Sequence, residues 1–468
     1  MYDIIVVAII CLKTVIFHKI CLGGNMKKVL VVLLSLLMVV SVFAQKGASA
    51  PKGRVEADAK IRIGVDNDEW GAAIVELWNK SYPRNKGALE YEYVGAAGAT
   101  DYVGQLQGDA ADVVLCIDGE VSRQAQSLLE MDKTIAKFAA TFAIEPFYSN
   151  TNETKNVYVP VAYDGMVFSW NKTMCEAIGL DITDADGDGL PEAFDTWEEI
   201  FAWSASLKDR PVYKGKKVNV VYPMSLANQW GCYSTLTAGG WQIYAEGDTS
   251  KPGFDKPEFK AGLDFLREAA KAKISVEANG QLTPGSSMAE RWQEYLDAEI
   301  SPFALVGSWM DVKGAEAATG SDFKFSRMPT WKGNQLTPLV KTKGFVINGF
   351  TRYPGAAKEL VKLLVSKAGM QLMVDHSSYI PAMQANAPTL PDFSKEENKR
   401  EMQAGFAACY AEPSDSLPIN KQMACMQCYY NIAIEQSYFP VWDGTTDSAT
   451  AQAEIVKNAA NWFNTNNR

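Results

Sequence analysis

The chain has 468 residues, 21% of them charged, and a formal net charge of −10 at neutral pH. An acidic chain of this kind repels nucleic acid and anionic membrane surfaces, so neither is expected as a partner. It contains only two histidines, which practically excludes His-based acid–base catalysis and a His-rich zinc site, and its length allows two or three domains.

The N-terminal segment has the features of a secretory signal peptide. Residues 26–28 are a short basic start, residues 29–40 are almost wholly apolar, and small residues at 42–44 stand at the usual cleavage offsets. The apolar core is short for a transmembrane anchor, which is the alternative interpretation, and no cysteine near the cleavage site could carry a lipid. We therefore expect cleavage near Ala44, a periplasmic monomer without a membrane anchor, and Met26 as the true start, with residues 1–25 an upstream extension.

Removal of residues 1–44 leaves a net charge of −13, one histidine (His376) and six cysteines. Cys425 and Cys428 have the C-x-x-C spacing of redox and zinc motifs. Because this pair stands in a helical-looking run without a neighbouring βαβ pattern or a second ligand pair, neither chemistry is favoured. In an oxidising compartment some cysteines can pair. The sequence leaves open the pairing of all six, which are Cys116, Cys175, Cys232, Cys409, Cys425 and Cys428.

Beyond the signal peptide, strand-like and helix-like segments alternate along the chain. The apolar patterns first predict strands at 61–65, 89–94 and 112–115, separated by helices at 72–81 and 101–107. Farther on they predict strands at 218–222, 302–306 and 343–348, helices at 257–272, 287–299 and 354–366, and a largely helical tail at 397–464. This alternation favours an α/β fold with a mainly parallel sheet.

Polar side chains follow two of the early strands. Asp66, Asp68 and Trp70 come directly after the first strand, and Asp118 and Glu120 follow the strand at 112–115. In open α/β sheets, ligands bind outside the carboxyl ends of the strands. These residues are therefore candidates for a binding site, although Asp118 or Glu120 could instead cap the helix that follows.

Several motifs occur in an order that resembles the bacterial extracellular solute-binding proteins of family 1, the maltose-binding type that serves ABC sugar importers. They are Ala-Asp-Val-Val at 111–114, Val-Pro-Val at 159–161, Trp-Asn-Lys at 170–172, Thr-Trp-Glu-Glu at 196–199, Gly-Gly at 239–240 and Gly-Ser-Trp at 307–309. No single motif is specific. Their common order behind a signal peptide carries the resemblance, which extends from about residue 60 to about residue 461.

The resemblance implies a periplasmic-binding-protein-like fold, in which two α/β lobes are joined by crossover strands and hold the ligand between them. The expected N-lobe comprises residues 60–162 and about 343–390, and the expected C-lobe comprises about 165–340 and about 395–468. The implied function is capture of a sugar or oligosaccharide and its delivery to the permease subunits of an ABC importer, with no enzymatic activity. Binding would close the lobes by a hinge motion.

The resemblance also implies roles for individual residues. Asp164 falls where the family has a crossover carboxylate that touches the ligand, and it is a charged residue inside an apolar strand pair that needs a partner. Trp309 falls on the Trp that stacks on a sugar ring. Gln229 and Trp230 fall in a C-lobe loop that supplies another aromatic ring. Either Trp could instead serve only as core or as a cap of the C-lobe.

Two departures from the pattern leave the ligand open. Cys116 replaces an N-lobe aromatic residue, and Gln427, beside Tyr429 and Tyr430, falls at a stacking aromatic of the C-terminal part. One alternative is the same fold with a polyamine, a glycerol phosphodiester or another small solute. The other is a secreted hydrolase that uses Asp118, Glu120 and Asp164 as acid and base. The predicted site loops contain acids and aromatic residues and one arginine, Arg123, which favours a neutral or cationic ligand.

The segment 184–195 fits the pattern of a calcium-binding loop. Carboxylates stand at positions 1, 3, 5 and 12, glycine stands at position 6, Leu190 offers a carbonyl at position 7, and Glu192 stands at position 9. The candidate ligands are Asp184, Asp186, Asp188, Leu190, Glu192 and Asp195. Three aspartates at alternate positions repel one another without a cation, so we expect a structural Ca²⁺ here. The alternative is a solvated acidic loop.

Overall fold

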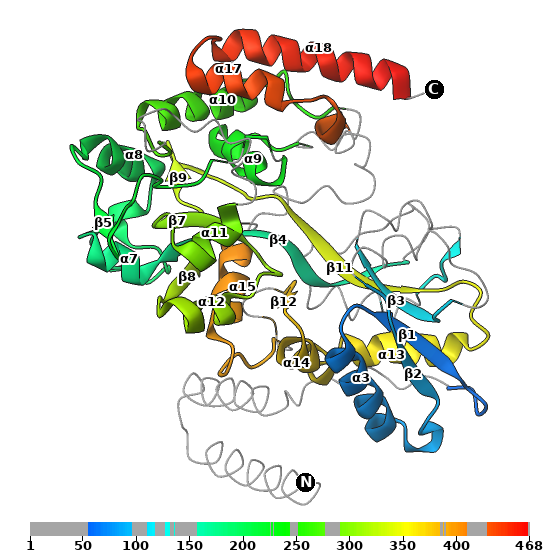
Figure 1. Ribbon diagram of the computed structural model, residues 1–468. Coiled ribbons are helices and arrows are strands. Elements are labelled where there is room, and N and C mark those ends of the chain that lie inside the picture. The colour runs from blue at the N-terminus through cyan, green and yellow to red at the C-terminus, as the bar shows by residue number, and fades with distance from the viewer. Residues whose placement is uncertain are drawn as a thin grey trace, which may run out of the picture. The chain divides into compact units, whose positions relative to one another are not determined.

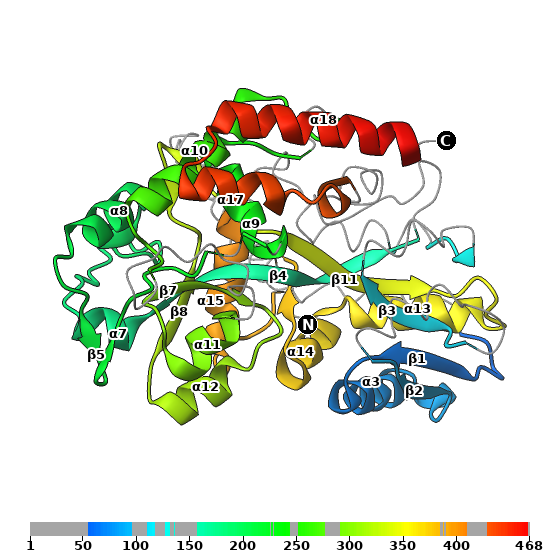
Figure 2. The same ribbon diagram turned by 45° about the horizontal axis from the view of Figure 1, so that its top comes forward.

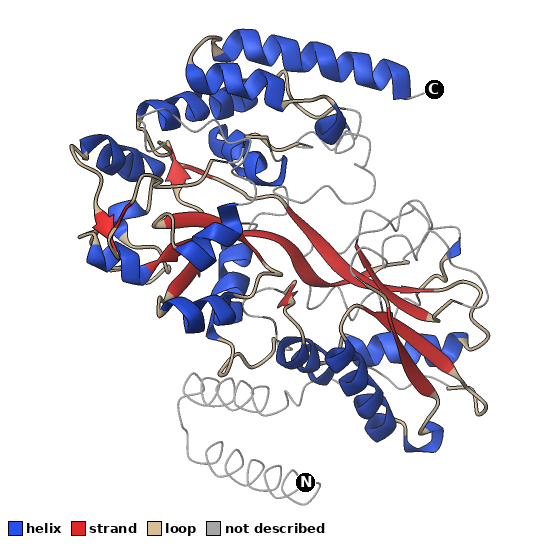
Figure 3. Cartoon of the chain, viewed as in Figure 1, coloured by secondary structure: helices blue, strands red, loops and turns tan. Residues whose placement is uncertain are grey.

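The computed structural model describes residues 55–466, apart from gaps at 96–109, 118–126, 132–134, 136–156, 225, 228, 244–250, 277–290, 384–386, 388–389 and 410–427. Helices and strands alternate through this part of the chain (Figures 1 and 3). The predicted signal peptide, the predicted helix at 101–107, Asp118, Glu120 and Cys425 all lie outside the described residues. No helix of the described chain is both long enough and apolar enough to cross a membrane.

The first lobe is built on a mixed sheet, which corrects the prediction of a mainly parallel one: the first strands pair in parallel, but the strands that return from later in the chain pair antiparallel. Strand β1 (Ile61–Val65) pairs in parallel with β2 (Leu89–Tyr93) and with β3 (Val113–Ile117). Strand β11 (Val340–Ile347) returns from far along the chain and pairs antiparallel with β3. The strand order β12-β4-β11-β3-β1-β2 therefore brings the ends of β1 and β11 into one sheet, where the predicted site residues begin.

The crossover is strand β4 (Val159–Asn171), which is buried along its full length. Its first half pairs with β11 and with β12 (Ile380–Pro381), and its second half pairs with β7 (Phe303–Gly307) and β8 (Phe323–Ser326). Figure 2 shows β4 running from one group of elements to the other beside β11. One continuous strand thus belongs to both lobes, and Asp164 lies near its middle.

Helices cover both sheet regions. In the first lobe they are α3 (Asp68–Ser81), α13 (Pro354–Leu364) and α14 (Lys367–His376), with the short η1 (Pro83–Asn85). The remaining helices are α7 (Lys172–Ala177), α8 (Trp197–Ser206), α9 (Gln229–Leu236), α10 (Pro257–Lys271), α11 (Arg291–Ala298), α12 (Val312–Thr319), α15 (Glu397–Cys409), α17 (Glu435–Asp443), α18 (Ser448–Asn466), η4 (Glu192–Phe194) and η5 (Thr237–Gly239). Two small hairpins pair β5 (Val212–Tyr213) with β6 (Lys216–Lys217) and β9 (Thr330–Trp331) with β10 (Asn334–Gln335).

Each lobe has its own hydrophobic core. The core of the first lobe joins apolar residues of β1, β3, α3 and α13, with Trp78 fully buried. The larger core of the second lobe joins β7, β8, α10 and α17, with Trp197, Trp241 and Trp442 at its centre. Two separate cores joined by a buried crossover are what a hinged, two-lobed protein requires, because neither core is opened when the lobes move.

Two predicted elements differ from the structure. Helix α3 begins at Asp68, four residues earlier than expected, because the side chain of Asn67 accepts a hydrogen bond from the Trp70 amide and caps the helix. The predicted strand at 218–222 is not a strand, and its pairing is a single bridge between Val220 and Ser275. Helix α8 begins within the Thr-Trp-Glu-Glu motif, because Thr196 and Glu199 form a reciprocal capping box.

Candidate functional site

A buried ion pair lies at the carboxyl end of β1. The Lys343 ammonium lies 3.2 Å from the Asp66 carboxylate and donates a 2.6 Å hydrogen bond to the Tyr379 hydroxyl, which in turn donates to Asp66. Burial, followed by the Asp66 charge, raises the pKa of Tyr379 far above its usual range, so the hydroxyl stays a donor. The predicted site residue Asp66 is therefore held in place by two partners from β11 and the segment before β12.

Asp164 lies beside this ion pair at the middle of the crossover. Its Cα is paired across the β4–β11 ladder with that of Lys341, and its side chain is 8% exposed. Burial raises the pKa of Asp164, the charges of Lys343 and Lys341 oppose the rise, and the charge of Asp66 adds to it. A carboxylate in this position is costly to keep charged, and a hydrogen-bond donor from a bound molecule would lower that cost.

Two predicted tryptophans meet in the second lobe. Trp230 is in the first turn of α9 and Trp309 follows β7; their rings are 6.0 Å apart in an edge-on arrangement. Trp309 is 46% exposed, which is unusual for so large an apolar side chain. The Lys341 ammonium lies 5.5 Å from the Trp230 ring centre and 5.6 Å from that of Tyr430. We call Trp230, Trp309 and Tyr430 the aromatic platform.

The other predicted site residues have different surroundings. Trp70 is 1% exposed and packs against Phe345 and Tyr379, so the expectation that it faces a ligand is corrected: it belongs to the core of the first lobe. Asp68 is exposed in the first turn of α3, where a negative charge favours the helix dipole. The backbone carbonyl of Gln229 accepts a hydrogen bond from Tyr429, which ties α9 to the C-terminal helices.

Sequence reasoning missed Lys341, Lys343 and Tyr379. The available signal was the same one that identified Asp164, namely charged residues inside an otherwise apolar strand, since Lys341 and Lys343 alternate within β11. Tyr93 was also missed. It ends β2, opposite Val65 of β1, and its ring is 59% exposed. Its position at a strand end adds an exposed aromatic side chain to the edge where Asp66 lies.

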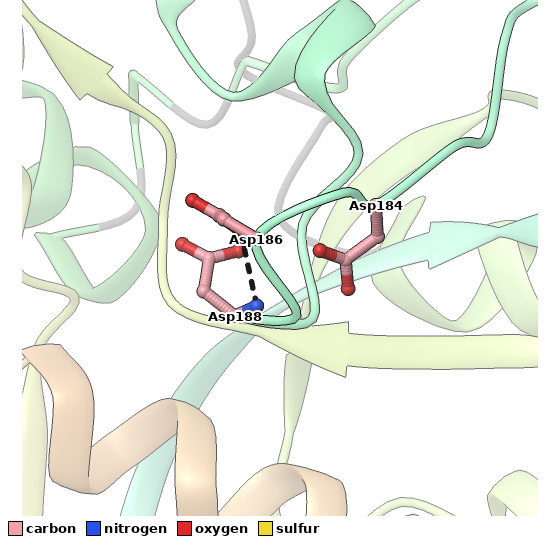
Figure 4. Close-up of side chains that lie close together, drawn as sticks. All are labelled: Asp184, Asp186 and Asp188. Carbon is pink, nitrogen blue, oxygen red and sulfur yellow. Dashed lines mark hydrogen bonds between the residues drawn. The ribbon is translucent and has the colours of Figure 1, made fainter.

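The acidic loop brings together only part of its predicted ligand set (Figure 4). Carboxylate oxygens of Asp184, Asp186 and Asp188 all lie within 4.8 Å of one another, and the three residues are exposed. Asp184 accepts hydrogen bonds from the Gly187 and Gly189 amides at 2.7 and 2.9 Å, which folds the loop around it.

The later positions of that loop are engaged elsewhere. The Arg327 guanidinium donates to Asp188 at 2.8 Å and also to Asp195. Glu192 accepts a 2.6 Å hydrogen bond from the Ala185 amide, and Leu190 is buried. The oxygen-only donor set of the three clustered aspartates suits a hard cation such as Ca²⁺, whereas Glu192 and Asp195 would have to leave their present partners to join it.

Comparison with known proteins identifies the family of the chain. The family model for bacterial extracellular solute-binding proteins matches residues 84–401, which is more than half of the chain. A search of curated proteins found no match.

Solved structures with the same fold include a cyclo/maltodextrin-binding protein complexed with maltotetraose (16% identity over 88% of this chain and 98% of that one, TM-score 0.67). They also include the maltose-binding periplasmic protein MalE of Listeria monocytogenes in complex with maltose (13% identity over 88% of this chain and 99% of that one, TM-score 0.67). A third is the maltodextrin-binding protein MalE1 of L. casei BL23 without ligand (17% identity over 87% of this chain and 99% of that one, TM-score 0.63). These likenesses confirm the predicted periplasmic-binding-protein-like fold, and the chain belongs to the bacterial extracellular solute-binding protein family.

Proposed function

We propose that the protein captures a sugar or oligosaccharide between its two lobes and delivers it to the permease subunits of an ABC importer. The observation that carries this proposal is the aromatic platform, with Trp309 46% exposed beside Trp230. Exposed tryptophan rings stack on the apolar C–H face of a pyranose, whereas an importer of simple ions has no use for them. Similar structures bound to maltose and maltotetraose support the same ligand class.

The polar groups near the platform suit binding better than hydrolysis. A glycosidase needs one carboxyl group free to act as acid and another free to act as base or nucleophile. Asp66 is instead held by Lys343 and Tyr379, and of the three acid–base candidates the described part of the chain contains Asp164 alone, because Asp118 and Glu120 lie outside it. We therefore propose that the protein has no hydrolase activity. Release of shorter sugars from an oligosaccharide panel would contradict this.

The proposed setting is the periplasm, reached through a signal peptide cleaved near Ala44, where the protein acts as a monomer without a membrane anchor. The family is extracellular, which supports export. Mass spectrometry of the protein recovered from a periplasmic extract would test the cleavage site, with a mature N-terminus at Gln45 expected. A protein that retains residues 26–44 and fractionates with membranes would refute this.

A thermal-shift panel tests the ligand class, because a ligand that binds only the folded state raises the melting temperature with the logarithm of its excess. The panel holds neutral and acidic saccharides, polyamines and a glycerol phosphodiester. At a hundredfold excess over Kd, the expected gain from a bound saccharide is about 2.7 kcal/mol. A shift by a polyamine or the phosphodiester, without one by any saccharide, would replace the sugar with that solute.

We further propose that the acidic loop binds a structural Ca²⁺ through Asp184, Asp186 and Asp188, with the Leu190 carbonyl as a further ligand. Support comes from the clustering of the three carboxylates and from the loop pattern, whose glycine at position 6, Gly189, adopts a positive φ of 89°. Glu192 and Asp195 would complete the site only after release from Ala185 and Arg327. The ion would stiffen the connection between α7 and α8, away from the aromatic platform.

A further inference from the structure

Lys341 is a charged residue beside the aromatic platform that was not among the predicted site residues. Lys341 and Lys343 alternate along β11, so their side chains leave the same face of the sheet. Lys343 is engaged by Asp66 and Tyr379. Lys341 differs: within the described part of the chain its recorded contacts are two ring faces, Trp230 at 5.5 Å and Tyr430 at 5.6 Å. These cation–π contacts hold the ammonium at the aromatic platform without occupying its hydrogen-bond donors.

The carboxylate that is paired with Lys341 across the strand ladder is that of Asp164. Asp164 stands across the β4–β11 ladder and is 8% exposed, and among the described residues no hydrogen bond to its carboxylate is found. Burial is the largest influence on the pKa of Asp164, and together with the Asp66 charge it raises that pKa despite the two lysine charges. Asp164 and Lys341 therefore form an opposed pair. The Asp164 carboxylate can still accept a hydrogen bond from a third group, and the Lys341 ammonium can still donate one to it.

We propose that Lys341 makes this site select saccharides that carry a carboxylate, meaning uronic-acid residues. This rests on the proposed sugar-binding function. The pyranose stacks on Trp309, its carboxylate accepts charge-assisted hydrogen bonds from Lys341, and a ring hydroxyl donates to Asp164. A uronate offers all three groups on one ring. A phosphate is a poorer match, because its second negative charge would face Asp164 and, among the described residues, the platform offers the Lys341 ammonium rather than an Arg fork.

Two matched ligand pairs test the selection by calorimetric titration of the whole protein. One pair is maltotriose and the same trisaccharide oxidised at C6 to uronates; the other is α-1,4-galactotriose and trigalacturonate. Because hydrogen bonds to charged groups are the stronger ones, we expect the acidic member of the pair that fits to bind about tenfold or more tightly at low salt. The preference should shrink as salt is raised.

The variant Lys341→Gln should bring the acidic ligand down to the affinity of its neutral partner and change the neutral partner by less than about threefold. Lys332→Gln is the matched control, since the Lys332 ammonium also lies over a tryptophan ring, 4.0 Å from the centre of Trp331, but is exposed and outside the platform. It should change neither ligand. The melting temperature without ligand checks that both variants fold.

The outcomes separate this inference from the proposed function. If neutral trisaccharides bind as tightly as their uronates, or Lys341→Gln leaves the ratio unchanged, the selection by Lys341 is refuted while sugar binding stands. If no member of either pair binds, the selection of uronates is refuted, and the thermal-shift panel alone decides the proposed sugar binding. A preference for the uronate that survives high salt undiminished also counts against an ammonium–carboxylate contact.

Discussion

At the scale of single residues, Trp309 should carry much of the binding energy. Its exposed ring and its contact with Trp230 give a flat apolar surface, and truncation of such an anchor removes stacking and buried area at once. We expect Trp309→Ala to weaken saccharide binding by about 2 kcal/mol, or roughly thirtyfold in Kd, as measured by calorimetry. The melting temperature without ligand should change little.

The control for Trp309 is Phe350, another large side chain with 56% exposure. It lies after β11 in the first lobe, away from the platform. Phe350→Ala should leave the affinity for the same saccharide unchanged. Equal losses in the two variants, or no loss in Trp309→Ala, would mean that Trp309 is a surface residue without a role in the site.

We expect Asp164 to favour saccharide binding while lowering the stability of the free protein. Burial and the nearby Asp66 charge raise its pKa more than Lys343 and Lys341 lower it, so the folded state disfavours the charged carboxylate relative to a neutral group. We expect Asp164→Asn to raise the stability of the free protein at neutral pH by about 0.5–2 kcal/mol and to weaken saccharide binding. Urea unfolding of the unliganded protein measures the first effect.

The raised pKa of Asp164 also predicts how the stability difference between Asp164→Asn and the natural protein changes with pH. When a carboxyl group has a higher pKa folded than unfolded, its cost to stability is fully present above the folded pKa. As pH falls through that value toward the unfolded pKa of about 3.9, the folded state takes up the proton first and the cost disappears. The stability gap between Asp164→Asn and the natural protein should therefore narrow on acidification. A gap that widens would show that the lysines dominate.

At the scale of elements, the crossover depends on one glycine. A Cβ on Gly165 would lie 2.0 Å from the Val340 side chain and 2.5 Å from its Cα, which is backbone and cannot move aside. Gly165→Ala should force β4 and β11 apart and destabilise the protein by about 1–3 kcal/mol in urea unfolding. Gly179→Ala is the comparison, because no atom lies within 4 Å of its added Cβ; its positive φ of 81° makes it a control for strain alone.

The acidic loop gives the second prediction at this scale. If Ca²⁺ binds the three aspartates, millimolar Ca²⁺ should raise the melting temperature and a chelator should reverse the rise. Asp186→Asn should abolish the response, since Asp186 makes one local contact, to the Asp188 amide, and its loss should leave the loop folded. Asp181→Asn, an exposed aspartate outside the cluster, should keep it. If the melting temperature is the same with Ca²⁺ and with chelator, the calcium site is refuted, and the segment is a solvated acidic loop held by Arg327.

Elements and contacts elsewhere in the fold show what a sequence can and cannot predict. Local chemistry predicted β1 through its apolar run, and the capping box of α8, which the structure shows, is a local cause of the same kind. The ion pair of Asp66 with Lys343 joins residues 277 positions apart, so nothing local indicates it. Trp70 was misjudged for a related reason: its place after a strand suggested a site, whereas the Asn67 cap begins a helix there and turns the ring into the core.

At the scale of the whole molecule, the candidate contacts divide between the lobes. Asp66 and Tyr93 belong to the first, Trp230 and Trp309 to the second, and Asp164 and Lys341 lie on the strands that join them. A ligand that touches both lobes binds the closed arrangement better than the open one and so shifts the population toward it. The division into two cores allows that motion to occur without disruption of either.

This division predicts a measurable closure. Saturating saccharide should reduce the radius of gyration in small-angle X-ray scattering, and it should shift tryptophan fluorescence to shorter wavelength as Trp309 loses contact with water. In Trp309→Ala both changes should require a higher saccharide concentration, and a sugar that gives no thermal shift should cause neither. Compaction without a fluorescence shift would place the ligand away from Trp309. A fluorescence shift at constant radius would mean that the ligand binds one lobe only and that the hinge takes no part in capture.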